Sequence, residues 1–349
     1  MTTLTDHRSR VPVDLQEKVA FLKQPEAYPD APEAVEAVET HMAWVFLTER
    51  HAYKLKKPVD LEKLDFTTLE RRHWACTEEV RLNRRLAGDV YQGVVPLRVG
   101  PRGRLRLGDG GEVVDWLVQM RRLPADRMLD ALIEAGVWSS KYVRRGVRAT
   151  AHRLARFYEA AAPVPFAPAE YVQRFYEEAA ATAHALVASP YPLPRERVGE
   201  VFGMQAAFLR RTPDLLRTRA REKRIVEGHG DLRPEHVCLV DEPVVFDCLE
   251  FDRSLRLLDP VDELSFLAME CERLGAPEVG TLALATYADA TGDVPPDRLV
   301  HFYRSYRAVQ RARIAVRHTR RPATFDEAVW TRRANDYLEL AVQYAARLG

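Results

Sequence analysis

Lysine is scarce in this sequence, which otherwise uses arginine for its positive charges. Only eight of the 52 basic residues are lysine, and three of those eight fall within four positions, at Lys54, Lys56 and Lys57. The two residue types are not interchangeable, because the lysine ammonium is a compact point charge whereas the guanidinium is a planar fork. We therefore expect the ammonium group to matter at the one place where lysines are clustered.

Long apolar runs and an excess of one charge are absent as well. No segment approaches the roughly 18 apolar residues that a membrane span requires, and residues 1–10 are polar and lack the core of a signal peptide. The net charge of +1 argues against a dedicated nucleic-acid binder, which usually carries a clear basic excess. Membranes and nucleic acids are therefore not among the expected partners.

Cysteine is rare, and its spacing fits no zinc or redox motif. Two of the four cysteines, Cys238 and Cys248, lie in apolar runs, which favours buried and reduced thiols. Because reduced thiols are typical of the cytoplasm, we expect a cytoplasmic protein.

Two glycine-rich phosphate-binding motifs are missing. The sequence contains no Gly-x-x-x-x-Gly-Lys-Ser/Thr, which excludes a P-loop ATPase. The turn at residues 40–43, Thr-His-Met-Ala, also lacks the Gly-x-Gly-x-x-Gly of a kinase glycine loop. Phosphate contacts from loop backbone are therefore not expected at that turn.

The order of predicted elements places strands before helices. Runs at 35–40, 44–48 and 52–56, separated by short polar turns, predict an antiparallel meander. A helix should begin at a capping box of Thr67 and Glu70 and end near Leu86, and further strands are expected at 94–99, 104–107 and 113–120. Beyond residue 125 the pattern is helical, apart from short strands and loops at 225–252. We therefore predict an α+β protein with a strand-rich N-terminal lobe, 1–123, and a helix-rich C-terminal lobe, 124–349.

The most informative stretch is residues 229–236, His-Gly-Asp-Leu-Arg-Pro-Glu-His, which is followed at 244–247 by Val-Val-Phe-Asp. Phosphoryl transfer needs one carboxylate that orients and deprotonates the acceptor hydroxyl, and further groups that hold Mg²⁺ on the phosphates. Asp231 is the candidate base and Asp247 the candidate metal ligand. The alternative is an ordinary turn that carries His and Asp by chance.

Two further segments accompany these motifs: Tyr-Lys-Leu-Lys-Lys-Pro at 53–58 and Leu-Asn-Arg-Arg-Leu at 82–86. The combination resembles the aminoglycoside phosphotransferase and choline kinase family. The resemblance covers about 35–315 and points to a bacterial subfamily often fused to a C-terminal P-loop ATP-binding domain, which we do not expect in this chain. It implies a bilobal protein-kinase-like fold, a nucleotide between the lobes, and ATP and Mg²⁺ as cofactors, with Mn²⁺ as a further possibility.

At the chemical centre the resemblance assigns further roles. Arg233 stands where protein kinases place a lysine, so its fork would approach the transferred phosphoryl group; an exposed loop arginine is the alternative. His236 stands where the wider family has a metal-binding asparagine. Because Mg²⁺ prefers oxygen ligands, His236 is either a metal ligand or a hydrogen-bonded brace of the loop. Glu250 would assist Asp247, and Asp262 would brace the catalytic loop.

The nucleotide lysine is expected on the third strand. Lys54 is the candidate because Ala52 lies two positions earlier, on the same face, and leaves room for adenine; Lys56 shares that face and is the second choice. Glu79 is the expected partner of Lys54, since an inward carboxylate on the following helix would be costly without a cation; a solvated Glu79 is the alternative. The adenine edge would meet backbone groups at the end of the last strand of this lobe: Gln119, Met120 and Arg121.

A predicted helix over 303–317 carries Arg304, Arg307 and Arg311 on one side. This face would either bind an anionic acceptor or form a solvated basic surface.

We therefore predict an ATP-dependent phosphotransferase that acts on a hydroxyl of a small polar molecule, such as a sugar or amino sugar. The alternative is a catalytically weak kinase fold that binds nucleotide and regulates a partner, such as a separate P-loop protein. The missing glycine loop and His236 favour that alternative. A protein kinase fits less well, because His-Gly-Asp replaces His-Arg-Asp and Asp-Phe-Gly is absent.

Overall fold

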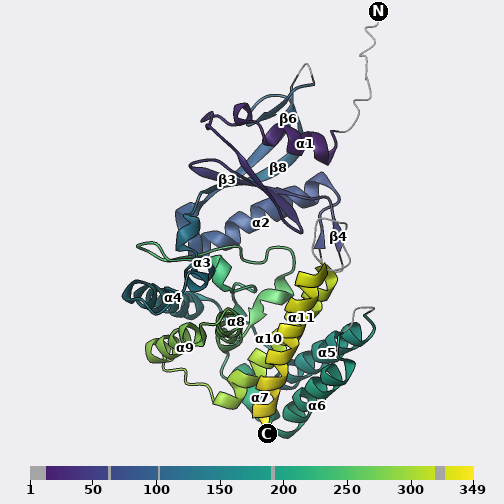
Figure 1. Cartoon of the computed structure of the whole chain (residues 1–349), viewed down its shortest axis with the longest axis vertical. Helices are drawn as coiled ribbons and strands as arrows, with labels where there is room; N and C mark the ends of the chain where they lie inside the picture. Colours follow the sequence, from purple (N-terminus) through teal and green to yellow (C-terminus); the bar gives the residue numbers. More distant parts are fainter. Residues whose placement is uncertain (1–12, 62–63, 101–102, 190–192, 319–326) are drawn as a thin grey trace, which may run out of the picture. The chain divides into compact units, whose positions relative to one another are not determined.

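The computed structural model describes residues 13–61, 64–100, 103–189, 193–318 and 327–349, so the polar N-terminus of the sequence lies outside the described residues (Figure 1). The chain forms two compact units. The first holds the residues up to Leu123 together with Glu250–Asp252, and the second holds Pro124–Leu249 and Arg253–Gly349. A segment of three residues from the second half of the chain thus belongs to the first unit.

The first unit contains a six-stranded sheet with the order β1-β2-β3-β8-β6-β7, in which every neighbouring pair is antiparallel. Its strands are β1 (Glu36–Glu39), β2 (Ala43–Leu47), β3 (His51–Lys56), β6 (Tyr91–Val99), β7 (Leu105–Leu107) and β8 (Glu112–Arg121). A short hairpin, β4 (Asp60–Leu61) and β5 (Leu64–Asp65), follows β3. The meander predicted from the first three runs is confirmed, and β8 lies between β3 and β6.

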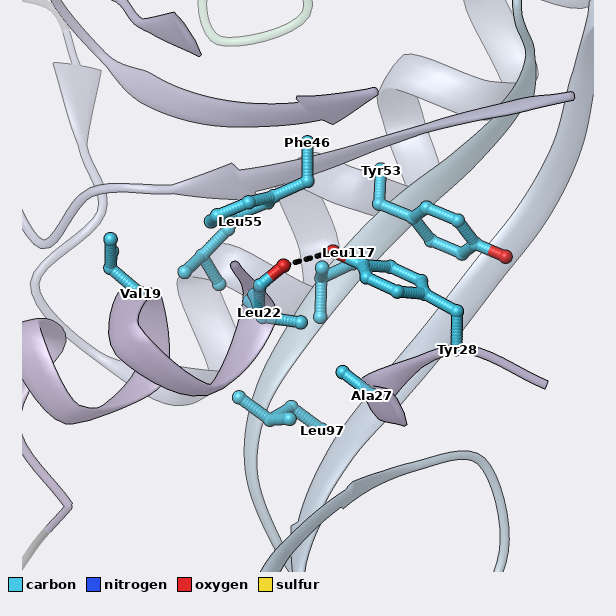
Figure 2. Close-up of a cluster of buried hydrophobic side chains, with 9 residues drawn as sticks. All are labelled: Val19, Leu22, Ala27, Tyr28, Phe46, Tyr53, Leu55, Leu97 and Leu117. Carbon is cyan, nitrogen blue, oxygen red and sulfur yellow. Dashed lines mark hydrogen bonds between the residues drawn. The ribbon is translucent and has the colours of Figure 1, made fainter. Parts of the chain in front are cut away.

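One face of this sheet packs against helix α1 (Leu15–Leu22) and the turn after it. Figure 2 shows the cluster that results, in which Leu22 and Tyr28 meet side chains of β2, β3, β6 and β8. The Tyr28 hydroxyl donates a hydrogen bond of 2.5 Å to the Leu22 carbonyl, which satisfies a buried polar group inside the cluster. Alternating apolar residues such as Phe46 and Leu55 are fully buried, as a period of two requires.

Helix α2 (Leu69–Ala87) packs against β6 and β8. Its N-cap is Thr68, whose hydroxyl accepts from the Arg71 N–H at 3.2 Å. The capping box predicted at Thr67 and Glu70 is therefore wrong by one residue, because the Thr67 hydroxyl donates to Asp65 Oδ1 instead. Glu79 points inward as predicted, and it lies on a stripe of buried residues: Ala75, Glu79, Leu82 and Leu86.

The second unit is mainly helical. Its helices are α3 (Leu129–Glu134), α4 (Lys141–Ala160), α5 (Pro168–Val187), α6 (Arg195–Arg211), α7 (Pro213–Arg221), α8 (Pro260–Arg273), α9 (Pro277–Thr291), α10 (Asp297–His318) and α11 (Glu327–Ala345). Two short ladders interrupt them: β9 (Val226–Glu227) with β12 (Leu257–Leu258), and β10 (Val237–Cys238) with β11 (Val244–Val245). The predicted α+β order, an antiparallel sheet followed by a helix-rich part, is confirmed.

Helix α8 forms the centre of this second unit. It contacts α9, α10 and α11, and each of its residues from Pro260 to Cys271 is buried. All four cysteines lie within the described residues and are buried, as expected of reduced thiols. Across the described ranges, every helix is too short or too polar to cross a bilayer.

Candidate active site

The loop that carries Asp231 runs from β9 to a short turn of 3₁₀ helix at Pro234–His236. Gly230 adopts a φ of +90°, a backbone conformation that residues with a Cβ atom rarely adopt. Gly228 is required for a different reason, because a Cβ there would lie 2.7 Å from Glu263 Oε2. The two glycines therefore allow the loop backbone to approach helix α8 closely.

Glu263 of α8 holds this loop by its backbone. Its carboxylate accepts hydrogen bonds from the N–H groups of His229, at 3.0 Å, and Gly230, at 2.5 Å, and from the Tyr158 hydroxyl at 2.7 Å. The expectation that Asp262 braces the loop is therefore wrong. Asp262 pairs instead with Arg307 of α10 through two bonds of 2.7 and 2.6 Å.

His229 links the loop to the strand that precedes Asp247. Its Nε2 donates to the Phe246 carbonyl at 2.8 Å, since a carbonyl can only accept, and its Nδ1 accepts from the Asp231 N–H at 3.3 Å. Burial lowers the pKa of His229, which favours the neutral ring that this pair of bonds requires.

The Asp231 carboxylate lies among cationic groups. Arg233 Nε donates to Asp231 Oδ2 at 3.0 Å, and the same guanidinium contacts Glu235 and His236. Burial alone would raise the pKa of Asp231, but the charge of Arg233, followed by those of His236 and Arg311, outweighs it and holds the pKa below its ordinary value. Asp231 is therefore ionised at neutral pH and able to accept a proton.

The β10–β11 hairpin brings His236 and Asp247 together. The Phe246 N–H donates to the His236 carbonyl at 3.0 Å, and the next residue places Asp247 Oδ2 at 3.5 Å from His236 Nε2. Asp247 has a φ of +61°, a region that aspartate adopts at modest cost. Its side chain is 38% exposed, whereas that of His236 is buried.

The hydrogen bonds of His236 define which of its nitrogens could bind a metal. Nδ1 donates to the Asp231 carbonyl at 2.8 Å, so in the neutral ring Nε2 keeps the lone pair that faces Asp247. A histidine that binds a metal through one ring nitrogen usually donates the N–H of its other nitrogen to a carbonyl, a carboxylate or water. Arg233 Nη2 lies 3.2 Å from the same Nε2 atom. The guanidinium of Arg233 therefore lies where a metal ion bound to Nε2 would lie.

His236 and Asp247 together fit a divalent cation that takes its other ligands from phosphate oxygens and water, as Mg²⁺ usually does. Within the described ranges, no group of three or more His, Cys, Asp or Glu side chains is arranged to hold a metal by protein atoms alone. A cation held by His236 and Asp247 would therefore take its further ligands from water or from a bound phosphate compound.

In the first unit the structure brings Lys54, Lys56 and Glu79 together. Lys54 Nζ lies 2.9 Å from Glu79 Oε1, and Lys56 Nζ lies 2.6 Å from Glu79 Oε2. Lys56 also contacts Glu250 Oε1 at 2.5 Å, so Glu250 pairs with this lysine. Burial would lower the pKa of Lys56, but Glu250 and Glu79 outweigh it and raise that pKa. Lys56 thus remains charged beside Glu79, which is fully buried.

The three residues predicted to meet an adenine edge lie at the end of β8. Gln119 and Met120 pair with β3 on one side and with β6 on the other, so their peptide groups belong to an interior strand. Arg121 pairs with His51 of β3. Ala52 lies opposite Met120 in the same ladder.

The arginines of α10 do not form the solvated basic surface that was one of the two expectations, while the binding of an anionic acceptor stays a prediction. Each pairs with a carboxylate of α8: Arg304 with Glu272 at 3.5 Å, Arg307 with Asp262 at 2.6 Å and Arg311 with Glu270 at 3.2 Å. Their side chains are largely buried between the two helices. The helical spacing of these arginines is visible in the sequence, but nothing in the sequence shows that their acidic partners lie on α8.

Other proteins resemble this chain in sequence and in fold. No protein-family model matches it. The uncharacterized protein Rv2004c of Mycobacterium tuberculosis (strain ATCC 25618 / H37Rv) is 34% identical over 286 residues, which cover 80% of this chain and 54% of that protein. The uncharacterized protein Mb2027c of Mycobacterium bovis matches to the same extent. The chain therefore spans about half the length of the curated relatives it matches.

Solved structures define the fold class. A choline kinase from Cryptosporidium parvum Iowa II superposes with a TM-score of 0.54 at 9% identity, covering 95% of this chain and 96% of that chain. A thermostable mutant of aminoglycoside phosphotransferase APH(4)-Ia gives 0.51 at 10% identity, covering 88% and 94%. LicA in complex with AMP gives 0.50 at 15% identity, covering 97% and 100%.

This chain has the protein-kinase-like fold that choline kinases and aminoglycoside phosphotransferases share. The resemblance recognised in the sequence is confirmed at this level, since neighbours of both kinds are found among known structures.

Proposed function

We propose that this protein is an ATP-dependent phosphotransferase that phosphorylates a hydroxyl group of a small polar molecule. The observation that carries the proposal is the arrangement around Asp231: an ionised carboxylate on a loop held by α8, with Arg233 on it and His236 and Asp247 beside it. A base, a cation for phosphoryl charge and two metal ligands are the parts that phosphoryl transfer requires.

In the proposed reaction Asp231 orients the acceptor hydroxyl and takes its proton. The hydroxyl oxygen forms a bond to the γ-phosphorus of ATP as the bond from that phosphorus to the ADP oxygen breaks. Arg233 would counter the charge that develops on the phosphoryl oxygens. A divalent cation held by Asp247 and His236 would neutralise phosphate charge when bound.

The first unit would bind the nucleotide. Lys54 would contact its phosphates while Glu79 fixes the direction of the lysine side chain. Because Gln119 and Met120 lie within an interior strand, the base edge is expected to meet backbone groups from Arg121 onward. Nucleotide binding is in keeping with LicA, which was solved with AMP.

A sugar or amino sugar is the proposed class of acceptor. Neighbours such as a choline kinase and an aminoglycoside phosphotransferase are named for small polar molecules that carry hydroxyl groups. Fold likeness supports the reaction class better than the acceptor, so the acceptor has to be found by experiment.

The test is a screen of small hydroxyl compounds with ATP and Mg²⁺ or Mn²⁺, with ADP release as the signal and Asp231→Asn as the matched control. We expect at least one sugar or amino sugar to raise ADP release in the native protein. The variant should lose that activity and bind nucleotide almost as tightly, because the base acts in the transition state. A variant that turns over at the native rate would contradict the proposal. Native protein that binds nucleotide yet transfers phosphate to nothing would favour the alternative, a nucleotide-binding regulator.

A further inference from the structure

Four buried charged side chains form one group in the first unit, which we call the charge cluster: Lys54, Lys56, Glu79 and Glu250. Glu79 is shared, since each of its oxygens faces a different lysine. Lys56 is shared as well, since its ammonium contacts Glu79 at 2.6 Å and Glu250 at 2.5 Å. The charge cluster thus joins two basic and two acidic side chains through shared contacts.

Lys56 occupies the interior of the charge cluster. Its side chain is 1% exposed, against 16% for Lys54, and its ammonium lies 5.0 Å from the centre of the Phe66 ring. With two carboxylates and an aromatic face around it, Lys56 has no geometry for a phosphate. A buried carboxylate without a cation is strongly unfavourable, so Lys56 determines where both Glu79 and Glu250 can lie.

Glu250 connects the charge cluster to the segment that carries Asp247. The chain enters the first unit at Glu250 and leaves it after Asp252. The neighbouring Phe251 packs against a buried cluster of Leu64, Phe66 and Ala75 in the same unit. Asp247 lies only three residues earlier, so the contacts of Glu250 and Phe251 limit where its backbone can lie.

We propose that Lys56 is a positioning residue that acts on both the nucleotide-binding Lys54 and the metal-binding Asp247. Through Glu79 it fixes the partner of Lys54, and through Glu250 it fixes the segment that follows Asp247. Metal binding at Asp247 then depends on a lysine of β3 that touches neither metal nor nucleotide. This inference rests on the proposed function, because it takes Lys54 and Asp247 as the nucleotide and metal residues.

The experiment compares Lys56→Met, the double variant Lys56→Met/Glu250→Leu, and Lys57→Met as a matched control. Lys57 lies beside Lys56 but contacts Glu39 and the Thr40 carbonyl instead of the charge cluster. Three quantities are measured: the thermal unfolding midpoint, the dissociation constant of a fluorescent ATP analogue without metal, and Mn²⁺ binding by EPR in the presence of a non-hydrolysable ATP analogue.

We expect Lys56→Met to lower the unfolding midpoint by at least about 5 °C, because two buried carboxylates then share one lysine. The double variant restores one lysine and one glutamate, so its midpoint and its metal-free nucleotide affinity should return close to those of the native protein. Its Mn²⁺ affinity should stay about tenfold or more below the native value, as for losses of other groups that orient metal ligands.

Native Mn²⁺ affinity in the double variant would overturn the inference, since the Glu250 anchor would then have no effect beyond stability. Unchanged behaviour of Lys56→Met in all three measurements would do the same. A native protein that binds neither the ATP analogue nor Mn²⁺ would overturn the proposed function, and the inference with it. A loss of Mn²⁺ affinity in Lys57→Met as large as in the double variant would also count against a specific effect of Lys56.

Discussion

Lys54 and Lys56 stand two positions apart on one strand, yet their surroundings separate their roles. Lys54 is the more exposed of the two and forms an ion pair with one oxygen of Glu79, whereas Lys56 is buried between the carboxylates of Glu79 and Glu250. The sequence could place both lysines on one face by alternation, but it could not show that Glu250 comes from almost two hundred residues away to neutralise the second. Contacts of such sequence separation leave no local pattern.

Replacing Lys54 by alanine should weaken nucleotide binding by about tenfold to a hundredfold, the range expected for lost charged hydrogen bonds. Stability should change little, because Glu79 keeps its bond to Lys56. Titration with a fluorescent ATP analogue measures the first quantity and thermal unfolding the second. If Lys54→Ala binds normally and Lys56→Ala loses binding at native-like stability, Lys56 is the nucleotide lysine.

His236 allows a second test at the level of one residue. Imidazole suits transition ions better than Mg²⁺, so the native protein should work at least as well with Mn²⁺ as with Mg²⁺. His236→Asn replaces the ring nitrogen by an oxygen ligand and should shift the preference towards Mg²⁺. The measurement is the ratio of the two metal affinities in the nucleotide complex, with Asp247→Asn as a control that should weaken both ions. A ratio that stays the same in His236→Asn, with a lower unfolding midpoint, would show that His236 only braces the loop.

Neighbouring positions on a helix point in directions about 100° apart. The prediction that Asp262 holds the catalytic loop is therefore wrong, although the correct residue is the next one along α8. The family resemblance suggested Asp262, but the packing of α8 turns Glu263 towards the loop and Asp262 towards α10. Gly228 is the sequence feature that fits this packing, because a Cβ atom there would lie 2.7 Å from Glu263 Oε2. The same limit applies to α2, where Thr67 and Thr68 are both acceptable caps and only the start of the helix decides between them.

At the scale of this element, Glu263→Gln should destabilise the catalytic loop. A glutamine keeps one acceptor oxygen, which can still serve the N–H groups of both His229 and Gly230, but it removes the negative charge from these bonds and puts an NH₂ group where Oε2 accepts from His229. The expected loss is about 1–3 kcal/mol of stability, with reduced turnover. Hydrogen exchange of the two amides and the unfolding midpoint measure it. Tyr158→Phe is the matched control, since it removes a bond to the same carboxylate and leaves the loop contacts; an equal loss in both variants would contradict a specific role in the loop.

The two units differ in how far the sequence could anticipate them. The sheet of the first unit follows from alternation and short turns, so its strands were located within a few residues. The second unit depends on ion pairs between helices distant in sequence, such as Arg219 of α7, which bonds to both Asp259 and Asp293 with distances of 2.6–2.7 Å. Arg219 had no motif to mark it, and neither acid carries a signal that names its partner.

This pairing should make the stability of the whole protein depend on acid pH. Burial alone would raise the pKa of Asp293, but the hydrogen bonds and charge of Arg219 outweigh it and lower that pKa. A lowered pKa in the folded state gives a stabilising contribution that is full above the unfolded value of about 3.9 and is lost as the pH falls through the folded value. Asp293→Asn should therefore be less stable at pH 7 and lose less stability between pH 5 and pH 3. Unfolding midpoints across that range test the sign; parallel curves for the two proteins would refute it.

The short excursion of the chain at Glu250–Asp252 has a consequence for dividing this protein into parts. A fragment that ends near Leu123 would contain Lys56 without Glu250, and its cluster around Leu64 and Phe66 would lack Phe251. A fragment that begins at Pro124 would carry an apolar ring and a carboxylate whose partners were left behind. We therefore expect neither half to fold by itself. Dissection at the apparent boundary should yield two insoluble pieces, whereas adding a short peptide that spans 247–253 should help the first of them to fold.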